Sequence, residues 1–125
     1  MMITMRVVKD PKETEHFAAE YGVEPEAGLC LYLAENRSES IGVCFYRFTD
    51  FGMKILLAET GGDLTLFDGL IRATMAALFD REEDRVEFDG RMDREALRSC
   101  RFVTGDELWI ASANHFFETC KNCKN

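Results

Sequence analysis

Three apolar segments joined by short polar turns constrain the fold of this chain more than any other feature. Residues 28–33, 41–48 and 53–58 are rich in aliphatic and aromatic side chains, and the polar stretches 35–40 and 49–52 separate them. Connections this short join antiparallel neighbours, so we expect a meander of three strands. The nearly continuous apolar character of the segments indicates a sheet that is covered on both faces.

Beyond the third segment, the apolar residues change from the spacing of a strand to that of a helix. Leu66 and Leu70 begin a helical repeat that runs to about residue 80, which predicts a largely buried helix. An earlier helix starts at Asp10 and Pro11, because an acidic N-cap followed by proline is typical of helix N-termini. Gly22 is expected to end it.

Four shorter elements complete the pattern. We expect strands at residues 3–8, 85–88 and 108–111, and a helix at residues 94–100. Helices placed between strands of a mixed sheet predict an α/β (α+β) domain. A length of 125 residues is typical of a single domain. We place this domain at residues 1–118 and a polar tail at residues 119–125.

The charge balance excludes several classes of partner. Lys and Arg number 15 against 23 Asp and Glu, which gives a net charge of −8. Nucleic-acid binding depends on cations that neutralise phosphates, so we expect neither nucleic acid nor an anionic membrane as a partner. An acidic surface suits amines and cationic peptides, although it also serves solubility alone. No apolar run approaches the roughly 18 residues of a membrane span, and no signal peptide is evident, so we expect a cytoplasmic protein.

Five cysteines are an odd number, and without an export signal they indicate reduced thiols. Cys120 and Cys123 form a Cys-x-x-Cys motif, which with His115 offers three soft metal ligands. Structural zinc takes four ligands, so we expect no metal site. A redox dithiol is the second interpretation of the motif, and two incidental thiols in a flexible tail are the third.

Three segments carry a resemblance to a known family. Residues 68–73 (DGLIRA) place a glycine before aliphatic helix residues, residues 94–102 (REALRSCRF) form a helix that ends before a phenylalanine, and residues 106–110 (DELWI) supply the next strand. Their order and spacing resemble the GNAT N-acetyltransferase superfamily. The resemblance implies a mixed, mostly antiparallel central sheet of about six to seven strands flanked by three helices. It also implies acetyl-CoA as cosubstrate and acyl transfer to a small-molecule amine or a peptide.

The same resemblance assigns candidate site residues. The start of the central helix would hold the pyrophosphate of acetyl-CoA on its backbone amides, and the end of the fourth strand would face the thioester. Glu59, at that strand end, is the candidate catalytic base, and its alternative role is a solvated charge. The residues expected to bind the cofactor are Ala58, Thr60, Phe67, Asp68, Gly69, Leu70 and Arg72.

Three departures from the family pattern bear on the chemistry. The family's phosphate loop usually reads Gln/Arg-x-x-Gly-x-Gly/Ala, whereas only Gly69 matches here and the acids Asp63 and Asp68 flank the position of the anion. Leu97 stands where many members have a tyrosine that protonates the CoA thiolate. Only one helix separates the first two strands. The alternative function is therefore an inactive protein of this fold that senses acyl-CoA or binds another protein.

Two adjacent aromatic residues near the end of the chain are compatible with either a monomer or a homodimer. Phe116 and Phe117 precede the polar tail. They fit either the core or a contact between two copies, so a homodimer is one of the assemblies that the sequence allows.

Overall fold

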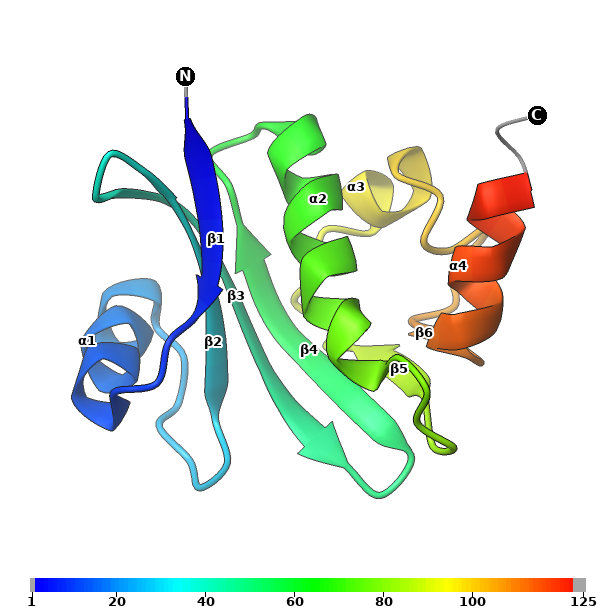
Figure 1. The fold of residues 1–125 in the computed structure, drawn as a ribbon, viewed down its shortest axis with the longest axis horizontal. Coiled ribbons are helices and arrows are strands. Elements are labelled where there is room, and N and C mark those ends of the chain that lie inside the picture. The colour runs from blue at the N-terminus through cyan, green and yellow to red at the C-terminus, as the bar shows by residue number, and fades with distance from the viewer. Residues whose placement is uncertain (1, 123–125) are drawn as a thin grey trace.

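The meander predicted from the three apolar segments forms the middle of a six-stranded sheet in the computed structural model, which describes residues 2–122. The elements, in chain order, are β1 (Ile3–Val7), α1 (Pro11–Tyr21), β2 (Cys30–Asn36), β3 (Glu39–Thr49), β4 (Gly52–Glu59), α2 (Leu64–Met75), the 3₁₀ turn η1 (Ala76–Leu78), β5 (Arg85–Phe88), α3 (Arg94–Ser99), β6 (Trp109–Ile110) and α4 (Ala113–Asn122). The strands follow one another across the sheet in this order, and all neighbours are antiparallel except β4 and β5 (Figure 1). The mixed, mostly antiparallel sheet confirms the predicted fold class.

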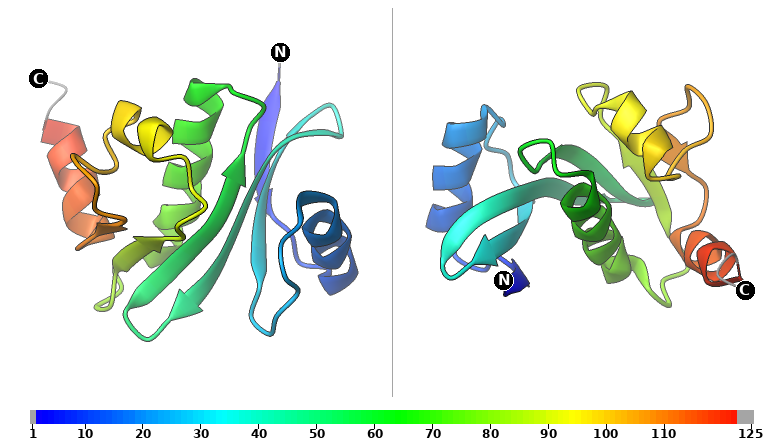
Figure 2. Two further views of the ribbon diagram at one scale, coloured as in Figure 1. Left: turned by 180° about the vertical axis from the view of Figure 1, so that it is seen from behind. Right: turned by 90° about the horizontal axis from the view of Figure 1, so that it is seen from above.

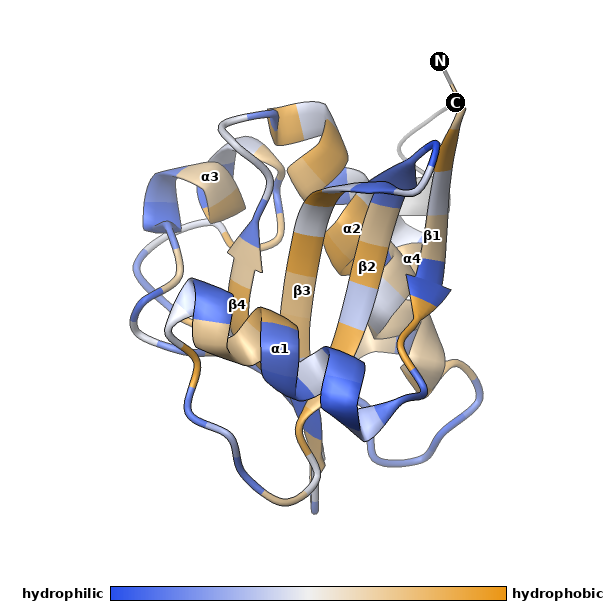
Figure 3. Cartoon of the chain, turned by 90° about the vertical axis from the view of Figure 1, so that its left-hand side faces the viewer, coloured by the Kyte–Doolittle hydropathy of each residue, from blue (hydrophilic) through white to orange (hydrophobic). Residues whose placement is uncertain are grey.

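Helices cover both faces of the sheet, as the apolar strands predicted. Figure 3 shows α1 on one side of β2 and β3 and α2 on the other. On the α1 side, Phe45 and Leu33 are fully buried in a cluster that includes Ala18 of α1. On the α2 side, Ile55 of β4 and Leu70 of α2 belong to a second, larger cluster. Alternate residues of β2 and β3 therefore contribute to two separate cores.

The helix starts depend on aspartate caps. The Asp10 side chain accepts a hydrogen bond from the amide of Lys12 at 2.9 Å, and Gly22 ends α1 with φ at 68°, as predicted. The Asp63 carboxylate accepts from the amide of Leu66 at 3.0 Å. Because Asp63 is the N-cap, α2 begins two residues earlier than the apolar repeat indicated.

Within residues 2–122 there are four α-helices instead of the expected three. The additional helix, α4, begins beside Asp84, whose Oδ2 accepts hydrogen bonds from Ser112 Oγ at 2.6 Å and from the amide of Asn114 at 3.0 Å. Burial alone would raise the pKa of Asp84, but these hydrogen bonds outweigh it and lower the pKa. The cap comes from a residue far away in the sequence, so the local pattern did not reveal the helix.

Aromatic contacts attach α4 to the rest of the domain. The ring of Phe116 stacks on Phe102 with centroids 5.5 Å apart, and Phe117 meets Phe79 edge-on at 4.8 Å. Both phenylalanines thus contact the rest of the domain within one copy of the chain.

Only the first cysteine of the Cys-x-x-Cys motif lies in a described element. Cys120 is in α4, whereas Cys123 is outside the described residues, so the chemistry of the motif stays a prediction. Among the described helices, none has the length and apolar character that a membrane span requires.

The parallel pairing of β4 with β5 begins at Gly52. Its φ is 147°, and a Cβ atom at this position would overlap the backbone of Arg85. The amide of Arg85 donates to the carbonyl of Phe51 at 2.8 Å, so the two strands come close at this point. Only glycine allows this approach without a shift of the backbone.

We therefore predict that Gly52→Ala lowers the free energy of unfolding by at least about 2 kcal/mol, because strained backbone costs about 1–3 kcal/mol and the Arg85 backbone must also move. Chemical denaturation followed by circular dichroism measures this change. Gly90→Ala is the matched control, since its φ is not positive and no atom lies within 4 Å of the added Cβ. Equal stability of the two variants would contradict the prediction.

Candidate functional site

The strands β4 and β5 separate halfway along β4. Their pairing ends at Ile55 and Phe88, where the amide of Asp89 donates to the carbonyl of Ile55 at 2.9 Å. Beyond this point the chain from β5 turns away from the sheet, while β4 continues to Glu59 (Figure 2). Among the described residues, no strand pairs with this edge of β4 over residues 56–59. We call the gap beside it the β4–β5 notch.

A bulge in β4 lies where the notch begins. Phe45 of β3 pairs with Leu57 and Tyr46 pairs with Ile55, so Leu56 is an extra residue in the ladder. As a result, the consecutive residues Leu56 and Leu57 both contact the cluster on the α1 side of the sheet. The bulge and the loss of β5 together leave backbone polar groups of β4 without a strand partner.

A small hollow occupies the notch where three elements meet. Its volume is about 100 Å³, and it lies between the end of β4, the start of α2 and the start of α3. The residues that line it are Ala58, Glu59, Thr60, Gly62, Leu64, Phe67, Asp93 and Ala96. The structure thus brings together four of the predicted site residues. Sequence reasoning identified Asp93 only as a helix cap, because its position near Glu59 depends on tertiary structure.

Four predicted residues of the central helix lie outside the hollow: Asp68, Gly69, Leu70 and Arg72. Gly69 is in the second turn of α2, and a Cβ there would meet the side chain of Met5 at 3.5 Å. The interpretation of Gly69 as the glycine that enters the helix is therefore wrong, since α2 already begins at Leu64. Leu70 is fully buried in the core on the α2 side of the sheet.

Asp68 and Arg72 form a structural pair on the side of α2. The Asp68 carboxylate accepts from Arg72 Nε, with both oxygens at 3.0 Å. The guanidinium of Arg72 also lies over the rings of Phe102 and Phe116, 5.4 and 5.1 Å from their centroids. These contacts join α2 to α4 and to the chain that follows α3.

Some of the backbone amides at the start of α2 already donate hydrogen bonds within the protein. The amide of Phe67 donates to the Asp63 carbonyl at 2.9 Å, so the amides predicted to hold pyrophosphate lie within the helical ladder. The amide of Leu66 is bound by the Asp63 carboxylate, and the amide of Gly61 donates to Glu59 Oε1 at 2.8 Å. In the described part of the chain, Leu64 and Thr65 remain as first-turn donors without a partner.

Carboxylates dominate the electrostatics of the notch. Glu59 is exposed, Asp63 caps α2, and Asp93 caps α3 by accepting from the amide of Ala96 at 3.1 Å. Burial raises the pKa of Tyr21 at the end of α1, and the charges of Glu20 and Glu59 raise it further. Tyr21 therefore lies within electrostatic reach of Glu59, a proximity that the sequence did not reveal. An anion in the notch would meet like charges.

The described cysteine thiols near the notch are poorly suited to act as nucleophiles. Burial raises the pKa of the Cys44 thiol to about 12, and burial followed by the Asp68 charge raises the pKa of Cys100. A thiol with a raised pKa is a poor nucleophile at neutral pH. Leu97 is fully buried and cannot donate a proton. Among the described residues, no group of three or more His, Cys, Asp or Glu side chains is placed to hold a metal ion.

Comparison with known proteins shows the fold alone. No protein-family model matches the sequence, and no curated protein matches it significantly. A candidate acetyltransferase from Exiguobacterium sp. 255-15 is similar in structure, with a TM-score of 0.62 and 13% identity over 95% of this chain and 99% of that chain. The candidate N-acetyltransferase YhhK from E. coli, solved bound to coenzyme A, has a TM-score of 0.54 and 10% identity over 87% of this chain and 97% of that chain. The chain thus has the GNAT-like fold of these two candidate acetyltransferases.

The cap at the start of α2 yields a stability prediction. Asp63→Ala removes the hydrogen bond to the Leu66 amide and should lower the free energy of unfolding by about 1 kcal/mol. Asp63→Asn keeps a good N-cap without the charge, so its stability should stay close to that of the unsubstituted protein. Urea denaturation of the three proteins measures both effects. Equal losses in the two variants would show that charge, and not the cap, is what stabilises the helix.

Proposed function

We propose that this protein binds an acyl-CoA in the β4–β5 notch and transfers the acyl group to an amine. The observation that supports this most is the unpaired edge of β4 beside the hollow at the start of α2. YhhK, which shares the fold, is bound to coenzyme A. The hollow holds about 100 Å³, so most of a bound cosubstrate would lie along the open side of the notch.

Each part of the cosubstrate has a proposed partner. The amide groups of the pantetheine arm would hydrogen-bond to the backbone of β4 as an added strand does. Ala58, Thr60 and the ring of Phe67 would face the pantetheine arm and the thioester that it carries. The diphosphate would accept from the amides of Leu64 and Thr65. The other predicted residues of α2 would support cosubstrate binding indirectly, by fixing the position of the helix. These residues are Asp68, Gly69, Leu70 and Arg72.

The proposed reaction is direct acyl transfer. The amine nitrogen attacks the thioester carbonyl carbon, the C–N bond forms, and the C–S bond breaks to release the CoA thiolate. Glu59 is the proposed base that takes the proton from the amine, directly or through a water molecule. Because Leu97 replaces the family's usual acid, the thiolate takes its proton from water. In the alternative route the thiolate takes the amine's proton itself, and no separate base is then needed.

The carboxylates around the notch oppose the diphosphate, which makes the charge of Asp63 a direct test. We predict weak binding of acetyl-CoA to the unsubstituted protein and binding roughly twofold to fivefold tighter in Asp63→Asn, since two like charges about 4–10 Å apart in water repel by about 0.4–1 kcal/mol. NMR titration with acetyl-CoA measures both affinities and locates the shifted amides. Asp50→Asn, an exposed acid in the turn between β3 and β4, is the matched control. The proposal fails if millimolar acetyl-CoA leaves the amides of residues 56–67 unchanged.

A second candidate function is a protein of this fold without catalysis. The buried Leu97 and the exposed Glu59, whose carboxylate already accepts from Gly61, favour it. A thiol-release assay with acetyl-CoA and a panel of small amines and a peptide separates the candidates. Thiol release supports the transferase, whereas binding without release supports an acyl-CoA sensor. Failure to bind leaves a protein-interaction module.

The proposed location is the cytoplasm. Cys30, Cys44 and Cys100 are unpaired in the described part of the chain. Thiols in this state are typical of a reducing compartment.

A further inference from the structure

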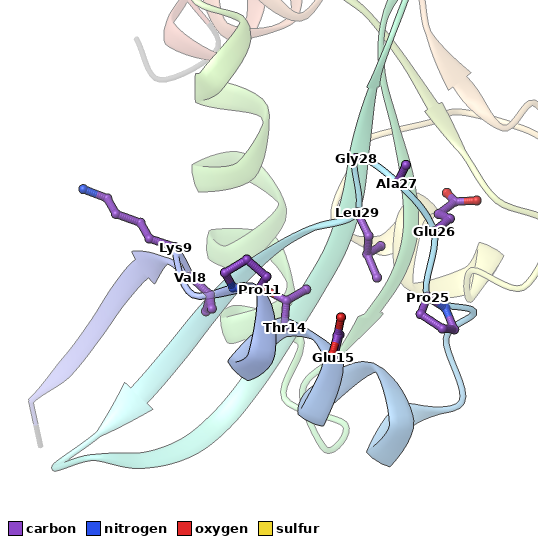
Figure 4. Close-up of a pocket in the computed structure, with 10 residues that line it drawn as sticks. All are labelled: Val8, Lys9, Pro11, Thr14, Glu15, Pro25, Glu26, Ala27, Gly28 and Leu29. Carbon is purple, nitrogen blue, oxygen red and sulfur yellow. The ribbon is translucent and has the colours of Figure 1, made fainter.

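A second hollow lies on the α1 side of the domain, apart from the notch. It has a volume of about 500 Å³, within the range of roughly 300–1,000 Å³ of small-ligand sites. Figure 4 shows it between the first turns of α1 and the connection from α1 to β2. The residues that line it are Val8, Lys9, Pro11, Thr14, Glu15, Pro25, Glu26, Ala27, Gly28 and Leu29.

The walls of this hollow combine aliphatic and polar side chains, and two prolines restrict their backbone. Val8 and Leu29 supply aliphatic surface on the side of the sheet. Pro11 and Pro25, the only two prolines of the chain, stand on opposite sides of the hollow (Figure 4). Proline limits the conformations of the backbone around it, so these walls are formed before a ligand arrives.

One carboxylate faces this aliphatic surface. Figure 4 shows Glu15 rising from α1 toward Leu29, whereas Lys9 extends away and Glu26 turns outward. Glu26 Oε1 is paired with Arg47 Nε at 3.2 Å. Among the described residues, no ion pair or hydrogen bond involves the side chain of Glu15. The hollow therefore combines aliphatic surface from Val8 and Leu29 with the exposed, unpaired carboxylate of Glu15, while the ammonium of Lys9, which also lines it, points away.

We propose that this hollow binds a small primary ammonium with an aliphatic body. An ammonium group donates hydrogen bonds to the Glu15 carboxylate, and the aliphatic body replaces water against the walls. The net charge of −8 attracts cations and repels anions of the same size. The lining contains no aromatic ring, so it lacks the cage that favours quaternary ammonium ions.

The probe for this proposal is hexylammonium chloride, titrated into the full-length isotope-labelled protein and followed by NMR. We expect saturable shifts of the amides of residues 8–10, 12–15 and 26–29. Hexanol tests the need for charge and hexanoate tests its sign, and both should bind at least threefold more weakly. Equal binding of hexanol or hexanoate would overturn the proposal. So would shifts confined to the β4–β5 notch.

Variants locate the site. Glu15→Gln removes the charge with little change of shape and should weaken hexylammonium binding roughly threefold or more. Ala27→Phe should block the hollow, and the exposed position of Ala27 leaves the core intact. Glu20→Gln is the control, because Glu20 is exposed on the same helix outside the lining. Unchanged affinity in Glu15→Gln would refute the site even if Ala27→Phe failed to fold. Acetyl-CoA titration of the same variants tests the notch separately, so the two proposals can fail independently.

Discussion

The short parallel pairing of β4 with β5 is the constraint on which the rest of the site depends. It starts at Gly52, where the absence of a side chain lets Arg85 approach, and it ends at Ile55, next to the bulge at Leu56. An unpaired strand edge inside a domain costs free energy unless its polar groups find other partners. The fold therefore contains a strand edge that water or an extended ligand must satisfy. The proposed acyl-CoA site uses this edge instead of a deep cavity.

The Asp63 carboxylate at the start of α2 stabilises the helix but weakens the proposed binding of an anion there. As an N-cap, the Asp63 carboxylate stabilises the helix by about 1 kcal/mol. As a negative charge, it repels an anion about 4–10 Å away at the same helix end by about 0.4–1 kcal/mol. The two effects are similar in size, so a single substitution can change which one dominates. This balance explains how a chain can have this fold and yet surround the proposed cofactor position with Glu59, Asp63 and Asp93.

Local signals in the sequence predicted the elements better than they predicted the site. The cap at Asp10, the stop at Gly22 and the meander follow from neighbouring residues, and the structure confirms them. The start of α2 was placed too late because the apolar repeat begins only at Leu66, two residues after the helix does. The helix α4 depends on Asp84, which is 28 residues away from Ser112. The hollow beside Glu15 requires two prolines from separate segments, and only tertiary structure brings them together.

The acidic surface acts in opposite directions at the two hollows. At the notch, carboxylates repel the diphosphate of an acyl-CoA, and salt screens that repulsion. Beside Glu15, the same excess of negative charge attracts an ammonium, and salt weakens that attraction. At 0.1 M salt the Debye length is about 10 Å, so charges farther than this from a bound ligand hardly affect its binding. Charges inside each hollow are closer than that and are screened only at higher salt concentrations. Raising the ionic strength should therefore strengthen the binding of acetyl-CoA relative to that of an alkylammonium. An equal response of both ligands to salt would mean that neither hollow is governed by the charges around it.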